Sequence, residues 1–303
     1  MNRYLSYILF IYSFFFIHGC REEEFLDYDL PSPPKLCVIS GYICEDSTCI
    51  ILTRNFKWSV NYQPDTSTFF LTGATVMLYE NNSFLDTLHL IEVKDQIYSN
   101  VRYYYQSKKG GQAGKKYRIE VQYEQLPVAW AETYMPSPPI VTIDTTVTIH
   151  VGHPYENENG YDTTKSMVGY QIDCVLSILD TDELSNFFQL RTDMLYIKPN
   201  PIVENSYLAS KNEDFWPLFS DRIFAGKSTQ FQLLDWLFEN ETSMLTILSL
   251  SEEGYRYYLS TSTYKHQQSD FTTEPVDLYS NVHNGMGIFF GLSARSFTLG
   301  VPK

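Results

Sequence analysis

The strongest constraint on the fold is an alternation of apolar and polar residues with a period of two. In 116–124 (KYRIEVQYE), apolar and aromatic residues take every second position, and charged or amide residues take the positions between them. Successive side chains of a strand point to opposite faces, so this pattern predicts a strand with one buried face. Segment 97–105 alternates in the same sense, and segment 74–80 alternates less cleanly. Aromatic residues make up 16% of the chain, which is a composition that strands favour.

Two proline clusters divide the sequence, PSPP at 31–34 and PSPP at 136–139. Proline has no backbone N–H, so neither cluster can lie inside a central strand. We read them as linkers around an N-terminal domain, residues 35–135. About seven short strands in such a length predict a β-sandwich of immunoglobulin-like or transthyretin-like type.

Residues 140–303 are expected to form a second β-rich domain with one or two short helices, which makes the protein mainly β. The segment 213–224 is read as a short helix or turn. Ser251 followed by Glu252 and Glu253 is typical of a helix N-terminus, and this helix should run to about residue 266. The remaining apolar segments predict strands at 140–150, 168–179, 187–197 and 286–299.

The first twenty residues have the organisation of a secretory signal. Arg3 is the only charge before an apolar run from Leu5 to Ile17. The run is shorter than the roughly 18 to 20 residues that cross a bilayer. It ends at Gly19-Cys20, which resembles the bacterial lipobox, and this implies a signal peptide of residues 1–19 and a lipid on Cys20. An ordinary signal peptide with a chance cysteine, or an uncleaved anchor, is the alternative.

Three acidic residues, Glu22, Glu23 and Glu24, follow almost directly after Cys20. They resemble the surface-export signal of Bacteroidota lipoproteins, which implies an outer-membrane protein whose lipid anchor holds it at the cell exterior. The alternative is a solvated acidic tether without an export role. In both readings residues 20–34 connect the anchor to the first domain.

The charge balance excludes one class of partner. Lys and Arg total 22, Asp and Glu total 36, and the isoelectric point is about 4.8. Nucleic-acid binding needs a basic surface that contacts phosphates, so we expect no nucleic-acid partner.

Four cysteines follow Cys20. Segments 36–44 and 49–54 read as a hairpin, in a register that sets Cys44 opposite Cys49 and gathers apolar residues on the other face: Cys37, Ile39, Ile43, Ile50 and Leu52. Cross-strand neighbours lie close to disulfide distance, so Cys44 and Cys49 are a candidate disulfide in an oxidising compartment. Cys174 alternates with apolar neighbours and is read as a small buried residue.

The sequence contains no catalytic motif that we recognise. His150 and His153 stand three apart, but no third ligand has a diagnostic spacing. Asp180, Asp182 and Glu183 could form an acid/base pair or a calcium loop, and a polar turn is the simpler reading. We expect no catalytic residue, no metal and no cofactor, and therefore a protein that is not an enzyme.

Runs of aromatic residues are the remaining candidates for binding. They are Tyr103-Tyr104-Tyr105, Tyr255-Arg256-Tyr257-Tyr258 and Phe289-Phe290. Exposed tyrosines are good contact residues, whereas most aromatic residues of a β protein belong to its core.

Several segments carry a family resemblance, most specifically SNVHNGMGIFFG at 280–291. Others are DTDELSNFFQL at 180–190, FSDRIFAGK at 219–227 and LTGATVMLYENN at 71–82. Together they resemble the domain-of-unknown-function family 4249 of Bacteroidota outer-membrane lipoproteins. The Asn and Gly residues of 280–287 suit a turn with left-handed backbone that leads into a buried strand.

The resemblance implies a cellular location and a class of partner protein. Members are outer-membrane lipoproteins often encoded beside TonB-dependent transporters, and the family offers no catalytic residue to carry over. We therefore expect an accessory or binding subunit of a TonB-dependent uptake system, with the outer membrane and a transporter barrel as partners and an unknown ligand. The alternative is a structural or adhesive surface lipoprotein without a transport role.

Overall fold

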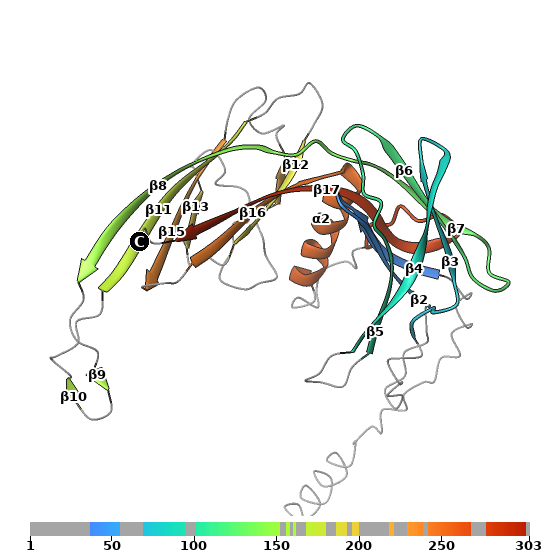
Figure 1. Ribbon diagram of the computed structural model, residues 1–303, viewed down its shortest axis with the longest axis horizontal. Helices are drawn as coiled ribbons and strands as arrows, with labels where there is room; N and C mark the ends of the chain where they lie inside the picture. Colours follow the sequence, from blue (N-terminus) through green and yellow to red (C-terminus); the bar gives the residue numbers. More distant parts are fainter. Residues whose placement is uncertain are drawn as a thin grey trace, which may run out of the picture. The chain divides into compact units, whose positions relative to one another are not determined.

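β-Strands make up most of the described chain in the computed structural model, which confirms the mainly β fold class. The structure describes residues 37–54, 69–94, 101–151, 156–157, 160–161, 168–179, 186–192, 196–199, 218–220, 229–238, 242–267 and 277–300. The largest element is an eleven-stranded sheet with the order β14-β12-β16-β17-β1-β2-β5-β4-β3-β6-β7 (Figure 1).

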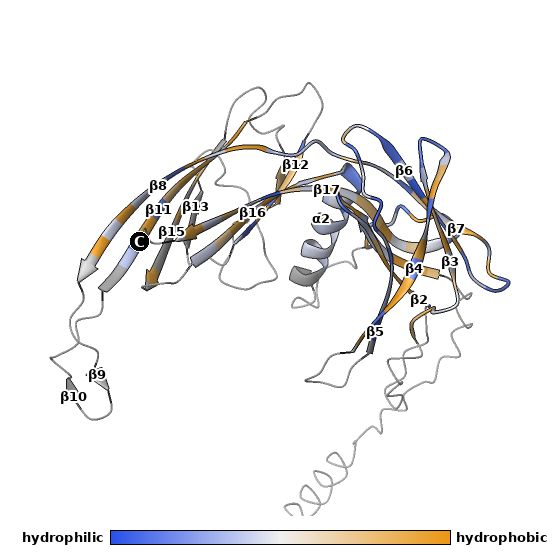
Figure 2. Cartoon of the chain, in the orientation of Figure 1, coloured by the Kyte–Doolittle hydropathy of each residue, from blue (hydrophilic) through white to orange (hydrophobic). Residues whose placement is uncertain are grey.

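The N-terminal strands form a sandwich-like arrangement within this one sheet, with a shared core between two groups of strands. They are β1 (Cys37–Ile43), β2 (Thr48–Arg54), β3 (Thr75–Glu80), β4 (Ser83–Lys94), β5 (Val101–Ser107), β6 (Lys116–Gln122) and β7 (Ala129–Tyr134). Side chains of β1 and β2 meet those of β3, β6 and β7 in one buried cluster, because every second residue of each strand points inward. The alternation read in 116–124 is confirmed: Tyr117, Ile119 and Val121 are buried in it. The intervening residues of β6 are hydrophilic (Figure 2).

The long strand β17 (Gly285–Gly300) joins the two halves of the chain. Its first half pairs in parallel with β1, with Cys37 opposite Gly285. Its second half pairs with β16 (Thr242–Leu250) in antiparallel register. A parallel pair needs a long crossover, and here almost the whole chain lies between the two strands. The segments on either side of the second proline cluster therefore share one sheet.

A four-stranded sheet lies in the C-terminal half, with the order β13-β15-β11-β8. Its strands are β13 (Tyr196–Pro199), β15 (Thr229–Phe238), β11 (Val168–Leu179) and β8 (Ile140–Val151). Apolar side chains of β11 and β15 form a second core with those of β12 (Phe187–Thr192), β14 (Leu218–Ser220) and β16. Cys174 is fully buried in this core, as predicted. The short strands β9 (Glu156–Asn157) and β10 (Gly160–Tyr161) pair with each other.

The predicted helix is present as α2 (Glu252–Gln267), and its helical side chains contribute to a third core on β17 (Figure 1). Ser251 caps it, since the N–H of Gly254 donates to Ser251 Oγ at 3.5 Å. A Cβ atom at Gly254 would lie 2.7 Å from the ring of Phe290. Glycine at this position therefore allows the helix to approach the sheet closely.

Three local predictions need correction. The hairpin register places Tyr42, not Cys44, opposite Cys49, because a tight turn closed by the Cys44 N–H and the Ser47 carbonyl at 2.9 Å starts β2 at Thr48. The shift of two residues keeps each side chain on its face, so the apolar face is buried as predicted.

The other two corrections concern the C-terminal half. The predicted strand 187–197 is two strands in different sheets, since β12 pairs with β16 and β13 with β15. In the segment 213–224, read as a short helix or turn, the described residues 218–220 form the strand β14, because the apolar side chain of Phe219 fills the second core beside β12.

Candidate functional site

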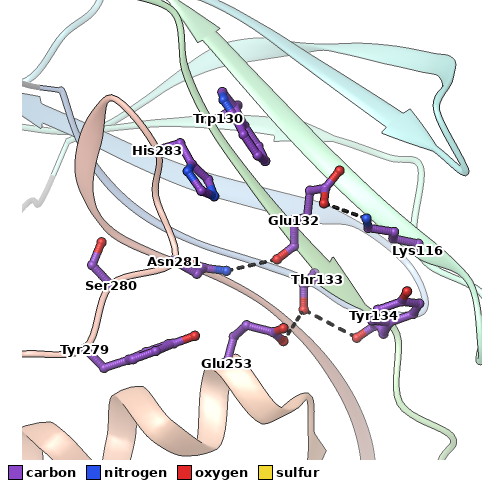
Figure 3. A pocket seen from close by; sticks show the side chains of 10 residues that line it. All are labelled: Lys116, Trp130, Glu132, Thr133, Tyr134, Glu253, Tyr279, Ser280, Asn281 and His283. Atoms are coloured by element: carbon purple, nitrogen blue, oxygen red, sulfur yellow. Dashed lines mark hydrogen bonds and ion pairs between the residues drawn. The ribbon is translucent and has the colours of Figure 1, made fainter.

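An open cavity of about 380 Å³ lies beside β7, the last strand of the large sheet (Figure 3). One wall is formed by the strand residues Trp130, Glu132, Thr133 and Tyr134, with Lys116 from the neighbouring β6. The opposite wall is the segment 279–283, which precedes β17, and Glu253 closes the space from the first turn of α2. The cavity therefore combines three parts of the chain that lie far apart in sequence.

The segment 279–284 is fixed against β7 by backbone hydrogen bonds. The N–H of Trp130 donates to the carbonyl of His283 at 3.1 Å, and the N–H of His283 donates to the carbonyl of Trp130 at 2.8 Å. Asn284 adopts φ 55°, Gly287 adopts φ 106°, and a Cβ atom at Gly287 would lie 1.9 Å from the carbonyl oxygen of Ile39. The left-handed turn expected from the motif is confirmed, and it brings the chain from the cavity into the centre of the sheet.

Asn281 has a structural role inside this segment. Its Nδ2 donates to the carbonyls of Glu132 at 3.0 Å and Phe289 at 2.7 Å, and its Oδ1 accepts the N–H of Phe289 at 3.0 Å. These bonds use both N–H donors of the amide and one lone pair of its oxygen. Asn281 therefore positions the wall of the cavity.

Trp130 lies in a layered stack. The imidazole of His283 lies 3.8 Å from the Trp130 ring, centroid to centroid, with 12° between the planes. The guanidinium of Arg118 lies 4.5 Å from the centroid of the same ring, which is a cation–π distance. Arg118 also pairs with Glu120 at 2.5 Å.

Two carboxylates face the cavity in different electrostatic settings. Glu132 pairs with Lys116 at 2.5 Å, and this hydrogen bond raises the pKa of Lys116. Glu253 Oε2 lies 3.0 Å from the hydroxyl of Thr133, a buried side chain that also lies 2.9 Å from Ser251 Oγ. Glu132 is thus neutralised by a cation, whereas Glu253 is held by a neutral hydroxyl.

Tyr279 completes the floor. Burial raises the pKa of its phenol, the nearby Arg256 lowers it, and the carboxylates of Glu253 and Glu252 raise it again. The guanidinium of Arg256 lies 4.3 Å from the centroid of the ring. The phenol therefore stays protonated at neutral pH and can donate a hydrogen bond.

The arrangement suits non-covalent recognition. It offers aromatic rings, a phenol, a serine hydroxyl and carboxylate oxygens around an open space, so its contacts with a ligand would be mainly polar. Within the described ranges, no three His, Cys, Asp or Glu residues gather closely enough to hold a metal ion.

The residues singled out from sequence fall in several places. Cys20, Glu22, Glu23 and Glu24 lie outside the described residues, as do His153, Asp180, Asp182, Glu183 and the side chain of His150. Cys44 and Cys49 are both half-buried free thiols, and their disulfide stays a prediction. No helix among the described residues is long and apolar enough to span a membrane.

The aromatic runs mostly serve the core. Tyr105 is buried, and its hydroxyl donates to the Leu71 carbonyl at 2.7 Å and accepts the Ala74 N–H at 2.9 Å. Phe289 and Phe290 are buried as well, and Tyr255, Tyr257 and Tyr258 pack around the third core. None of these residues lines the cavity.

Sequence reasoning missed the strand that carries the site. Residues 129–134 (AWAETY) place Ala129, Ala131 and Thr133 in the interior and alternate them with larger residues. This period-two pattern of small and large residues was the available signal. The meeting of Trp130 with His283 had no sequence signal, because 152 residues lie between them.

Comparison with known proteins identifies the family of the chain. No curated protein matches the chain. A family model described as "Domain of unknown function (DUF4249)" matches residues 23–298, which include all but the last two residues of the large sheet and all residues of the cavity. The chain therefore belongs to the DUF4249 family.

Proposed function

We propose that this protein is a surface-exposed outer-membrane lipoprotein that acts as a binding subunit of a TonB-dependent uptake system. The cavity beside β7 carries the proposal. The most specific motif of the sequence, 280–291, fixes one of its walls through Asn281 and His283. The carboxylates of Glu132 and Glu253 and the hydroxyl of Ser280 line the space between the walls. A binding protein needs such a preformed site.

The N-terminal sequence supports the proposed location. An apolar run that ends at Gly19-Cys20, followed by three glutamates, has the order of a lipoprotein signal and a surface-export signal. Residues 20–34 then connect the lipid to β1. A lipid anchor would hold the binding site at the membrane that contains the transporter.

The location can be tested by substitution in the native host. Cys20→Ala should abolish incorporation of labelled fatty acid. Joint replacement of Glu22, Glu23 and Glu24 by Ala should keep the lipid and lower cleavage by protease added to whole cells. Unchanged labelling would contradict lipidation at Cys20, and unchanged cleavage would leave the glutamates as tether only.

The partner can be tested by isolating the native protein from solubilised outer membrane. The proposal predicts that a TonB-dependent transporter co-purifies, and that the Cys20→Ala protein recovers much less of it. A structural or adhesive role predicts isolation without a transporter. The purified protein should convert no substrate in an activity screen, since binding is the proposed activity.

A further inference from the structure

We infer that the cavity beside β7 binds a cationic group, an ammonium or a guanidinium, with the carboxylate of Glu253 as its counter-ion. The inference rests on the proposed function, because it names the ligand class of the same site.

The first step is the distribution of charge. Lys116 and Glu132 neutralise each other at 2.5 Å. Glu253 accepts a hydrogen bond from Thr133 at 3.0 Å and forms no ion pair with any described residue. Of the two carboxylates that line the cavity, Glu253 is therefore the one without an ion pair among the described residues.

The second step concerns the aromatic rings. Trp130 is covered by His283 on one side and approached by Arg118 at cation–π distance. It is therefore not a free platform on which a sugar ring could stack. The ring of Tyr279 already carries the guanidinium of Arg256 at 4.3 Å from its centroid, so the hydroxyl is the part of Tyr279 that remains for a ligand.

The third step is the position of the hydrogen-bonding groups. Figure 3 shows the hydroxyl end of Tyr279 directed toward Glu253 at the floor of the cavity. An ammonium or guanidinium between them would donate hydrogen bonds to a carboxylate oxygen of Glu253 and to the hydroxyl oxygen of Tyr279. Hydrogen bonds to an ionised carboxylate are about twice as strong as those between neutral groups. An anionic ligand would be repelled by the carboxylate of Glu253. Its charge could not be compensated by Lys116, because Lys116 already pairs with Glu132.

Two small probes of nearly identical shape test the inference. Isothermal titration of the full mature protein in detergent would compare N-acetyl-arginine amide with N-acetyl-citrulline amide, whose urea group carries no charge. The inference predicts that the arginine probe binds at least about tenfold more tightly, because one charge-assisted contact is lost with citrulline. Methyl glucoside serves as a neutral sugar probe and should bind no better than citrulline.

Substitutions locate the counter-ion. Glu253→Gln keeps an acceptor for Thr133 and removes the charge, so affinity for the arginine probe should fall about tenfold or more. Glu252→Gln, in the same helical turn but outside the cavity, is the matched control and should change affinity less than twofold. Lys116→Gln frees Glu132 and should increase affinity, which a purely structural effect would not do.

Equal binding of the two amide probes, no binding of either, or an unchanged affinity in Glu253→Gln would overturn the inference. The inference would also be overturned if methyl glucoside bound with the same affinity to the wild type and to Glu253→Gln. None of these results bears on co-purification with a transporter, so the proposed function and the ligand class can fail separately.

Discussion

The imidazole of His283 stacks on the indole of Trp130 with ring centroids 3.8 Å apart, and these two residues also exchange a pair of backbone hydrogen bonds. The stack is the point where the family motif is attached to the edge of the large sheet. Arg118 forms the third layer of this stack, because its guanidinium lies at cation–π distance from the Trp130 ring.

His283→Ala should lower the free energy of unfolding by about 1 kcal/mol, since aromatic pairs contribute roughly 0.5–1.5 kcal/mol beyond the area they bury. His283→Phe keeps a flat ring and should retain most of that stability. Urea unfolding of both variants measures the difference. Equal destabilisation by alanine and phenylalanine would show that stacking does not hold the segment.

Asn281→Ala should be more damaging, because it leaves two carbonyls and one N–H without their partners. An unsatisfied buried backbone group costs about 1–3 kcal/mol, so a loss of at least about 2 kcal/mol is expected. Ser280→Ala is the control, since the hydroxyl of this exposed residue only accepts the N–H of Val282. A stability of Asn281→Ala equal to that of the control would refute the positioning role.

The buried phenol of Tyr117 should make the folded protein less stable in alkaline solution. Burial raises the pKa of its phenol to about 12; the N–H of Gln112 lowers it and the hydrogen bond to Glu80 raises it. The unfolded phenol ionises near pH 10, so the unfolded state releases its proton first and stability falls between about pH 10 and 12, by up to about 3 kcal/mol. Below pH 10 this contribution is fully present.

The matched variant is Tyr117→Phe, which cannot ionise. Its stability should fall less steeply between about pH 10 and 12 than that of the wild type. At about pH 8 it should be less stable by about 1 kcal/mol, because the bond to Glu80 at 2.7 Å is lost. Identical slopes in the two proteins would rule out Tyr117 as the titrating group.

The cysteines divide into two reactive classes. Burial raises the pKa of Cys37 and of Cys174 to about 11, so both should resist alkylation in the folded protein. Peptide mapping without reductant should find Cys44 linked to Cys49 after oxidation of the purified protein, once the turn between them shifts to bring the two thiols together. A link between Cys37 and Cys174 would contradict the structure, since they belong to different cores.

Local pattern was sufficient for most elements. The strands at 116–122 and 168–179 follow from period-two alternation, the helix after Ser251 follows from its capping serine, and the long C-terminal strand follows from its apolar residues. Ile39 and Ile50 were also placed correctly in the core although the predicted register was wrong. Side chains alternate between the two faces of a strand, so a register shift of two residues leaves each side chain on its face.

Non-local pairing was beyond such reasoning. The parallel contact of β1 with β17 and the meeting of Trp130 with His283 depend on which strands become neighbours, and no single segment encodes that choice. The cavity needs both contacts. A motif such as 280–287 could therefore be read as a turn, while the site that it helps to form could not be foreseen.

The most direct measurement of the central claim is growth of the native host on single nutrients, with three strains compared: a deletion, a chromosomal Glu253→Gln substitution and a chromosomal Glu252→Gln substitution. Binding in the cavity for uptake predicts that the deletion and Glu253→Gln grow poorly on the same nutrient at normal protein level, while Glu252→Gln grows as the wild type does. Normal growth of the deletion on every nutrient, or of Glu253→Gln where the deletion fails, would contradict the claim.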